Sequence, residues 1–204
     1  MGTGRLEAFS DGVLAIIITI MVLEFKTPQG VDLSALRPMF PVLMTYALSF
    51  IYLGIYWNNH HHLLQAASKV NGRILWYNLH LLFWLSLVPF VTSWMGPNRS
   101  VALPVALYGF VLLMAGFAYY FLECALAAHH GQGSALAIAR GKDLKGLASI
   151  LIYAVAIAAA FWRPSIALAL YVAVALMWFV PDRRIERALE RTASHPVGRT
   201  STEE

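Results

Sequence analysis

The chain has 204 residues, of which 59% are hydrophobic and 13% are charged, and its mean hydropathy is +0.62. These values exclude an ordinary soluble globular domain, in which about a quarter of the residues are charged. The single cysteine, Cys124, excludes an internal disulfide framework and any multi-cysteine metal site. The net charge of +4 comes from residues in connecting segments, so it indicates membrane topology rather than nucleic-acid binding.

The apolar residues fall in six blocks. A bilayer core about 30 Å thick needs roughly 17 to 25 apolar residues per helix, and several blocks reach that length. The last two are short and separated only by Arg163 and Pro164, which favours a tight helical hairpin over one broken element. We therefore expect an all-α membrane protein with six transmembrane helices per chain. The predicted spans are residues 9–25, 40–57, 74–95, 101–123, 147–162 and 165–181.

The basic residues predict the orientation of these spans. With a cytoplasmic N-terminus, eleven of the fifteen Lys and Arg residues lie in inside segments. Such an excess is typical of cytoplasmic segments, so both termini should be cytoplasmic in a multi-pass protein of the cell membrane. Residues 1–181 form the predicted membrane domain, and residues 182–204 form a basic, polar cytoplasmic tail. The four outside residues are Lys26, Arg37, Arg99 and Arg163.

The first span begins with ionisable residues. A carboxylate such as that of Asp11 costs about 2.5 to 3.5 kcal/mol at the centre of a membrane helix, so it should have a partner. One alternative is that Ser10 and Asp11 only cap the start of the helix. The second span returns a polar cluster, residues 57–62, to the same membrane level. The sequence thus also predicts a polar network that links the two helices.

The polar cluster includes three consecutive histidines, His60, His61 and His62. Neighbouring residues on a helix point about 100° apart, so these side chains do not readily converge on one metal ion. No HExxH motif is present. A hydrogen-bonding role is favoured, with pH sensing as the alternative, and we expect neither an enzyme nor a bound cofactor.

Gly12, Ile16, Thr19 and Leu23 recur at spacings of four, three and four residues in the first span. This spacing places them on one helix face. Such a face is usually ordinary packing, but in a symmetric assembly it could instead form successive layers around a pore.

The string Arg5-x-x-x-Phe9-Ser10-Asp11, followed by Gly-Val-x-Ala-Ile-x-x-Thr, resembles the opening motif of the transmembrane protein 175 family. The second span ends with Trp57-x-x-His60-His61, which is similar to the family as well. Animal members carry two six-helix repeats, whereas this motif occurs once, so the chain resembles the prokaryotic single-repeat form.

The resemblance implies a homotetrameric potassium-selective channel in the lipid bilayer, with potassium as the permeant ion and no organic substrate. The first helices would line the pore, and an apolar constriction would fall on Ile16, Thr19 and Leu23. No filter sequence like TVGYG is present, so the carbonyl-cage account of potassium selectivity cannot be carried over to this chain. The helix-linking polar network would comprise Arg5, Ser10, Asp11, Trp57, Asn59, His60 and His61.

Two other functions remain open from the residues themselves. A proton- or cation-coupled secondary transporter would use Asp11 and the histidines as relay groups. A membrane enzyme or sensor would use His60, His61 and His62 to hold a metal ion.

Overall fold

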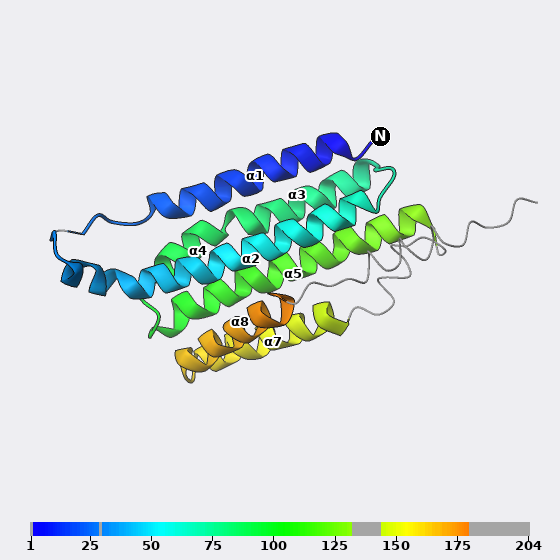
Figure 1. Ribbon diagram of the computed structural model, residues 1–204. Coiled ribbons are helices and arrows are strands. Elements are labelled where there is room, and N and C mark those ends of the chain that lie inside the picture. Colours follow the sequence, from blue (N-terminus) through cyan, green and yellow to red (C-terminus); the bar gives the residue numbers. More distant parts are fainter. Residues whose placement is uncertain (1, 29, 132–143, 180–204) are drawn as a thin grey trace, which may run out of the picture.

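The computed structural model describes residues 2–28, 30–131 and 144–179, and within these ranges all regular structure is helical (Figure 1). The predicted tail, residues 182–204, lies outside the described residues. The helices are α1 (Gly4–Leu23), the 3₁₀ helix η1 (Leu33–Met39), α2 (Phe40–Gln65), α3 (Gly72–Ser86), α4 (Val88–Met95), α5 (Ala102–His130), α7 (Leu144–Ala160) and α8 (Pro164–Phe179).

The six predicted helical segments are confirmed, with α3 and α4 together forming the third (Figure 1). This span breaks at Leu87, whose N–H bonds to the Trp84 carbonyl rather than continuing the α-helical pattern. Pro89 follows at the start of α4, where the missing N–H of proline is tolerated. Several helices extend beyond the predicted hydrophobic blocks. Residues 58–65, most of them polar, continue α2 past the apolar run.

The last two spans form the predicted hairpin. The Arg163 N–H donates to the Ala159 carbonyl at 2.7 Å, and Pro164 begins α8, so the chain reverses within a few residues. Ala156 and Ala160 of α7 and Ala167 of α8 are fully buried. Their small side chains let the two backbones approach closely, as is common in membrane bundles.

Buried polar groups in the bundle interior bond between helices. Tyr52 of α2 donates its hydroxyl hydrogen to the Tyr171 carbonyl of α8 at 2.6 Å. The hydroxyl of Ser49 lies 2.7 Å from that of Thr92 and 3.0 Å from that of Tyr108. These bonds connect α2 with α4, α5 and α8, so these hydroxyl groups find their partners inside the bundle.

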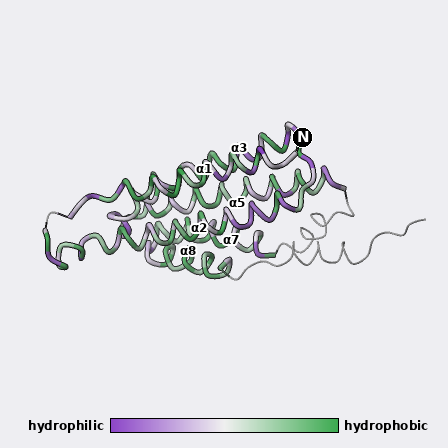
Figure 2. Tube along the Cα trace, turned by 45° about the horizontal axis from the view of Figure 1, so that its top comes forward, coloured by the Kyte–Doolittle hydropathy of each residue, from purple (hydrophilic) through white to green (hydrophobic). Residues whose placement is uncertain are grey.

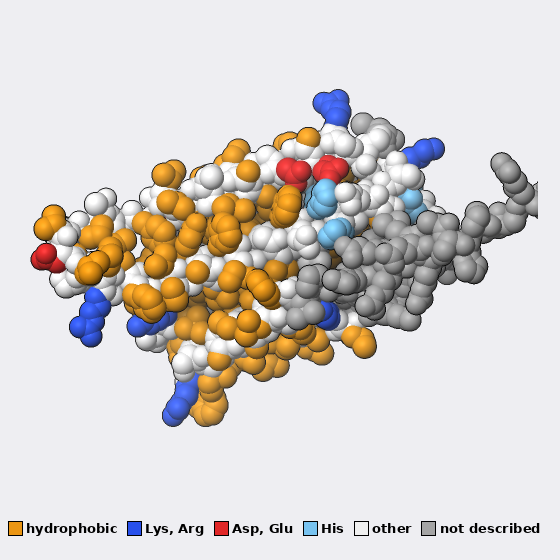
Figure 3. Space-filling model, in the orientation of Figure 1, with side chains coloured by type: hydrophobic (Ala, Val, Ile, Leu, Met, Phe, Trp, Pro, Cys, Tyr) orange, Lys and Arg blue, Asp and Glu red, His pale blue; other side chains and the backbone are white. Residues whose placement is uncertain are grey.

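The outer surface is apolar over the middle of the bundle. Figure 2 shows hydrophobic residues along most of each helix and hydrophilic residues concentrated near helix ends. In the view of Figure 3, hydrophobic side chains cover the middle, whereas Lys and Arg lie toward the two ends. Among the described residues, four helical stretches are long and apolar enough to cross a membrane, and α7 and α8 are shorter apolar helices. The protein is therefore a multi-pass membrane protein.

The close approach of α5 and α8 makes a prediction about Gly109. A Cβ atom at this position would overlap the phenol ring of Tyr171, whose hydroxyl donates to the Val105 carbonyl at 3.1 Å. Overpacking of this kind costs about 1–3 kcal/mol, so Gly109→Ala should lower the melting temperature of the detergent-purified protein. Gly54→Ala is the matched control, because no atom lies within 4 Å of its Cβ position. Equal melting temperatures for the two variants would show that α5 and α8 do not pack in this way.

Candidate functional site

Helix α1 packs against the rest of the bundle through one face. It contacts α2, α3 and α4, and Figure 1 shows it along one edge of the molecule. The residues of its packed face recur at helical spacing, which gives the helix a defined rotation about its own axis. They are Leu6, Ser10, Leu14, Ile17 and Met21.

The opposite face of α1 carries the residues predicted to form the constriction. Ile16 is 59% exposed and Leu23 is 81% exposed, and both Gly12 and Thr19 are exposed as well. The Thr19 hydroxyl lies 2.9 Å from the Ile16 carbonyl and 3.1 Å from the Ala15 carbonyl, so its hydrogen is donated to its own helix. The chain thus presents an apolar face on α1 that its own described helices leave largely exposed.

A buried chain of hydrogen bonds links α1, α2 and α3. Asn78 of α3 donates its Nδ2 hydrogen to the Ser10 hydroxyl at 2.9 Å, and Ser10 donates to the Leu6 carbonyl at 2.8 Å. On its other side, the Oδ1 atom of Asn78 lies 2.7 Å from Nε2 of His60. Because this oxygen is an acceptor, Nε2 of His60 carries the hydrogen. We call Ser10, Asn78 and His60 the buried triad.

Ser10 and Asp11 do not cap the helix, because α1 begins at Gly4 with Thr3 as its N-cap residue. Both side chains therefore lie within the helix, beyond its first turn. Their polar groups reach other helices, as the network hypothesis requires and the capping alternative does not.

A second set of contacts joins α1 to α2 nearer the surface. Trp57 donates its indole hydrogen to Oδ1 of Asp11 at 3.0 Å, and Nδ1 of His61 lies 2.9 Å from Oε1 of Glu7. The rings of Trp57 and His61 stack with centroids 5.9 Å apart. Figure 3 shows acidic and histidine side chains side by side near the N-terminal end of α1. We call these four residues the surface pairs.

The structure does not bring every predicted network residue into these contacts. Arg5 is exposed and makes no hydrogen bond or ion pair with the described part of the chain. Asn59 donates its side-chain hydrogen to the Ile55 carbonyl of its own helix at 2.9 Å. Only its backbone carbonyl reaches another helix, where it accepts from Tyr119 at 3.2 Å.

Two residues that make these contacts, Glu7 and Asn78, were not among the network residues predicted from the sequence. Glu7 could have been found, because it precedes Asp11 by four residues just as Trp57 precedes His61. In two antiparallel helices, such matched spacings place Glu7 opposite His61 when Asp11 lies opposite Trp57. Asn78 has no comparable signal, since its register against α1 and α2 depends on how α3 packs.

The histidines point to different helices. His60 bonds to α3, whereas His61 pairs with α1, as expected for neighbours about 100° apart. Among the described residues, no group of three or more His, Cys, Asp and Glu side chains could hold a metal ion.

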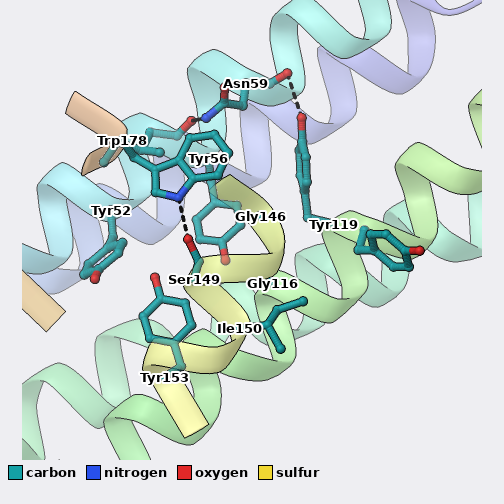
Figure 4. A pocket seen from close by; sticks show the side chains of 12 residues that line it. Tyr52, Tyr56, Asn59, Gly116, Tyr119, Gly146, Ser149, Ile150, Tyr153 and Trp178 are labelled. Atoms are coloured by element: carbon teal, nitrogen blue, oxygen red, sulfur yellow. Dashed lines mark hydrogen bonds between the residues drawn. The ribbon is translucent and has the colours of Figure 1, made fainter. Parts of the chain in front are cut away.

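A cavity lined by aromatic residues lies between α2, α5, α7 and α8 (Figure 4). Its polar groups bond mainly to the protein: Trp178 donates its indole hydrogen to the Ser149 hydroxyl at 2.8 Å, and Tyr119 donates to Asn59. No α1 residue lines it. The cavity is therefore separate from the exposed face of α1.

The buried triad makes a prediction about Asn78. Asn78→Leu keeps a similar volume but leaves the Nε2 hydrogen of His60 without its acceptor, which costs about 1–3 kcal/mol in a buried site. The melting temperature in detergent should fall clearly. Asn59→Leu is the matched control, because it removes only a hydrogen bond within one helix. If Asn59→Leu destabilises the protein as much as Asn78→Leu, the triad does not link the three helices.

Comparison with known proteins identifies related ion channels. The family model described as "Endosomal/lysosomal potassium channel TMEM175" matches residues 5–89. A potassium channel of Chryseobacterium is 53% identical over 93% of this chain and 99% of its own length. A potassium channel of Streptomyces collinus is 33% identical over 59% of this chain and 62% of its own length.

Among solved structures, the crystal structure of a lysosomal potassium-selective channel TMEM175 homolog from Chamaesiphon minutus superposes with a TM-score of 0.75. The two chains are 27% identical, and the match covers 87% of this chain and 96% of that one. The region matched by the family model, residues 5–89, includes the motif at the start of α1, the buried triad and the surface pairs. The chain therefore belongs to the TMEM175 family, whose members are ion channels and not enzymes.

Proposed function

We propose that this protein is a potassium-selective channel in the cell membrane, assembled as a homotetramer with α1 of each subunit lining the pore. The observation that carries the proposal is the exposed apolar face of α1. Ile16 and Leu23 lie on the side of the helix opposite its packed face. Four such faces around a symmetry axis would form successive apolar rings.

Similarity to the relatives supports potassium as the permeant ion and a channel as the type of transport protein. The Chryseobacterium relative is named a potassium channel, and the Chamaesiphon homolog is described as potassium-selective. The positive-inside distribution of basic residues supports a cytoplasmic N-terminus. On this orientation, the buried triad and the surface pairs lie toward the cytoplasmic end of α1 and the constriction extends toward the outer end.

Selectivity in this arrangement comes from dehydration. A ring of branched apolar side chains is too narrow for a fully hydrated ion and offers no carbonyl cage in exchange for its water. Potassium holds its hydration shell less strongly than sodium, so it passes such a ring at a lower free-energy cost. The Thr19 oxygen can replace a small part of the lost hydration. Its hydrogen is donated to the helix, so its remaining lone pairs can face a cation.

The contacts of α1 with α2 and α3 would hold these rings in place. The buried triad fixes the rotation of the helix near Ser10, and the surface pairs add two further links over Glu7 to Asp11. At the other end, Ser93 donates its hydroxyl hydrogen to Oε2 of Glu24 at 2.9 Å. The segment that carries Ile16, Thr19 and Leu23 is thereby held at both ends.

The proposal predicts the effect of making the constriction polar. Ile16→Asn and Leu23→Asn should each lower the preference for potassium over sodium severalfold, because an amide can replace part of the lost hydration. Flux through protein reconstituted in liposomes with opposed potassium and sodium gradients measures this preference. Leu151→Asn is the matched control, because Leu151 of α7 is 63% exposed and lies outside α1. It should leave the preference unchanged.

Three results would contradict the proposal. Purified protein that carries no potassium would remove the channel function. Saturable flux that depends on a proton gradient would support a coupled transporter instead. An unchanged ion preference in both α1 variants would mean that another helix forms the constriction.

A further inference from the structure

A groove lies between α3 and α5 at the end of the bundle where α1 begins. Figure 1 shows the N-terminal end of α3 beside the C-terminal half of α5 at this end. The groove is lined by Asn71, Arg73 and His129 at its polar end and by Tyr77, Phe121 and Ala125 along its apolar length. It is separate from the exposed face of α1, the buried triad and the surface pairs.

The hydrogen bonds of Asn71 determine which donor and acceptor atoms are available at the polar end of the groove. Its Oδ1 atom accepts the Ile74 N–H at 3.0 Å and so caps the start of α3. The Nδ2 atom is then left to face Nδ1 of His129 at 3.2 Å. Because an amide nitrogen can only donate, Nδ1 of His129 is the acceptor and its ring hydrogen lies on Nε2. His129 therefore provides an N–H donor in addition to the bond it makes with Asn71.

Arg73 adds a permanent positive charge. Its guanidinium carbon lies 5.6 Å from the centroid of the Tyr77 ring, and Nη2 donates to the Tyr77 hydroxyl at 3.3 Å. This contact holds the side chain beside the groove. A guanidinium has five N–H donors, and the described contacts use one of them, so most remain for an anionic ligand. No carboxylate is among the described residues that line the groove.

The rest of the groove is apolar. The rings of Tyr77 and Phe121 lie 6.3 Å apart and form one wall, and small residues of α5, such as Ala125 and Ala128, keep the groove open. From Phe121 to His129, the α5 backbone rises about 12 Å at 1.5 Å per residue. Along α5, the groove therefore extends from the charged groups near the end of the helix to the depth of the membrane hydrocarbon.

We propose that this groove binds an anionic phospholipid, with its phosphate on Arg73 and His129 and one acyl chain along Tyr77, Phe121 and Ala125. Basic pockets between transmembrane helices near the membrane surface are suited to such headgroups. The polar donors alone would fit any phosphate, and the apolar groove alone would fit any acyl chain. Their arrangement in one groove selects a molecule that has both. Lipid binding in this groove requires neither ion conduction nor a particular position of the pore.

The test is lipid retention by the full-length, detergent-purified protein. Native mass spectrometry measures bound phosphatidylglycerol and phosphatidylcholine after equal additions of each lipid. The wild-type protein should retain phosphatidylglycerol preferentially. Arg73→Gln should weaken this binding about fivefold, the effect of one basic residue near the membrane surface, and leave phosphatidylcholine unchanged. Arg163→Gln is the matched control, since Arg163 also lies over an aromatic ring, Trp162, at 5.9 Å but at the α7–α8 turn.

A second variant separates the headgroup from the chain. Ala125→Phe fills the apolar part of the groove and keeps Arg73, so it should also weaken phosphatidylglycerol binding. Inorganic phosphate in excess should not displace the lipid. The proposal is overturned if Arg73→Gln and Arg163→Gln behave alike, or if phosphate alone competes. It is also overturned if Ala125→Phe changes the oligomeric state and not lipid retention, because the groove would then be a contact between subunits.

Discussion

Lipid hydrocarbon offers no hydrogen-bonding partner, so polar side chains within membrane helices must find partners inside the protein. This constraint organises the contacts of α1. Ser10 is fully buried on this helix, and its hydroxyl bonds to Asn78, which in turn bonds to His60. Turning α1 about its axis would expose Ser10 to lipid and leave Asn78 and His60 without these partners. The hydrogen bonds therefore fix the rotation as well as the position of the helix.

The fixed rotation connects the polar contacts to the apolar face. Because Ser10 faces α3, the residues on the other side of α1 face away from the rest of the chain, and these include Ile16 and Leu23. The proposed constriction and the buried triad thus both depend on the rotation of α1 about its own axis.

Much of the fold could be predicted from the sequence because lipid imposes a simple length rule. Apolar blocks predict the six spans, and Arg163 with Pro164 predicts the hairpin. The break at Leu87 was not predicted, although Pro89 is a local signal for it. For the network, the level of residues 57–62 predicted that α2 would meet Asp11, and the structure shows the bond to Trp57.

The remaining contacts depend on packing between helices distant in sequence. Asn78 lies between Ser10 and His60 only because α3 packs against both α1 and α2. Arg5 shares the motif with Asp11 but faces away from the described contacts, and sequence spacing alone does not reveal a partner for it.

The most direct test of the account is thiol cross-linking of α1 between subunits in native membranes. Cys124 is the only cysteine, so Leu23→Cys in a Cys124→Ala background places one reactive thiol per chain. A short bifunctional thiol reagent should link the Leu23→Cys variant into dimers. The Leu151→Cys variant, at a position that is 63% exposed against 81% for Leu23, should remain unlinked. Efficient linkage at Leu151 and none at Leu23 would contradict the claim that α1 faces a shared axis.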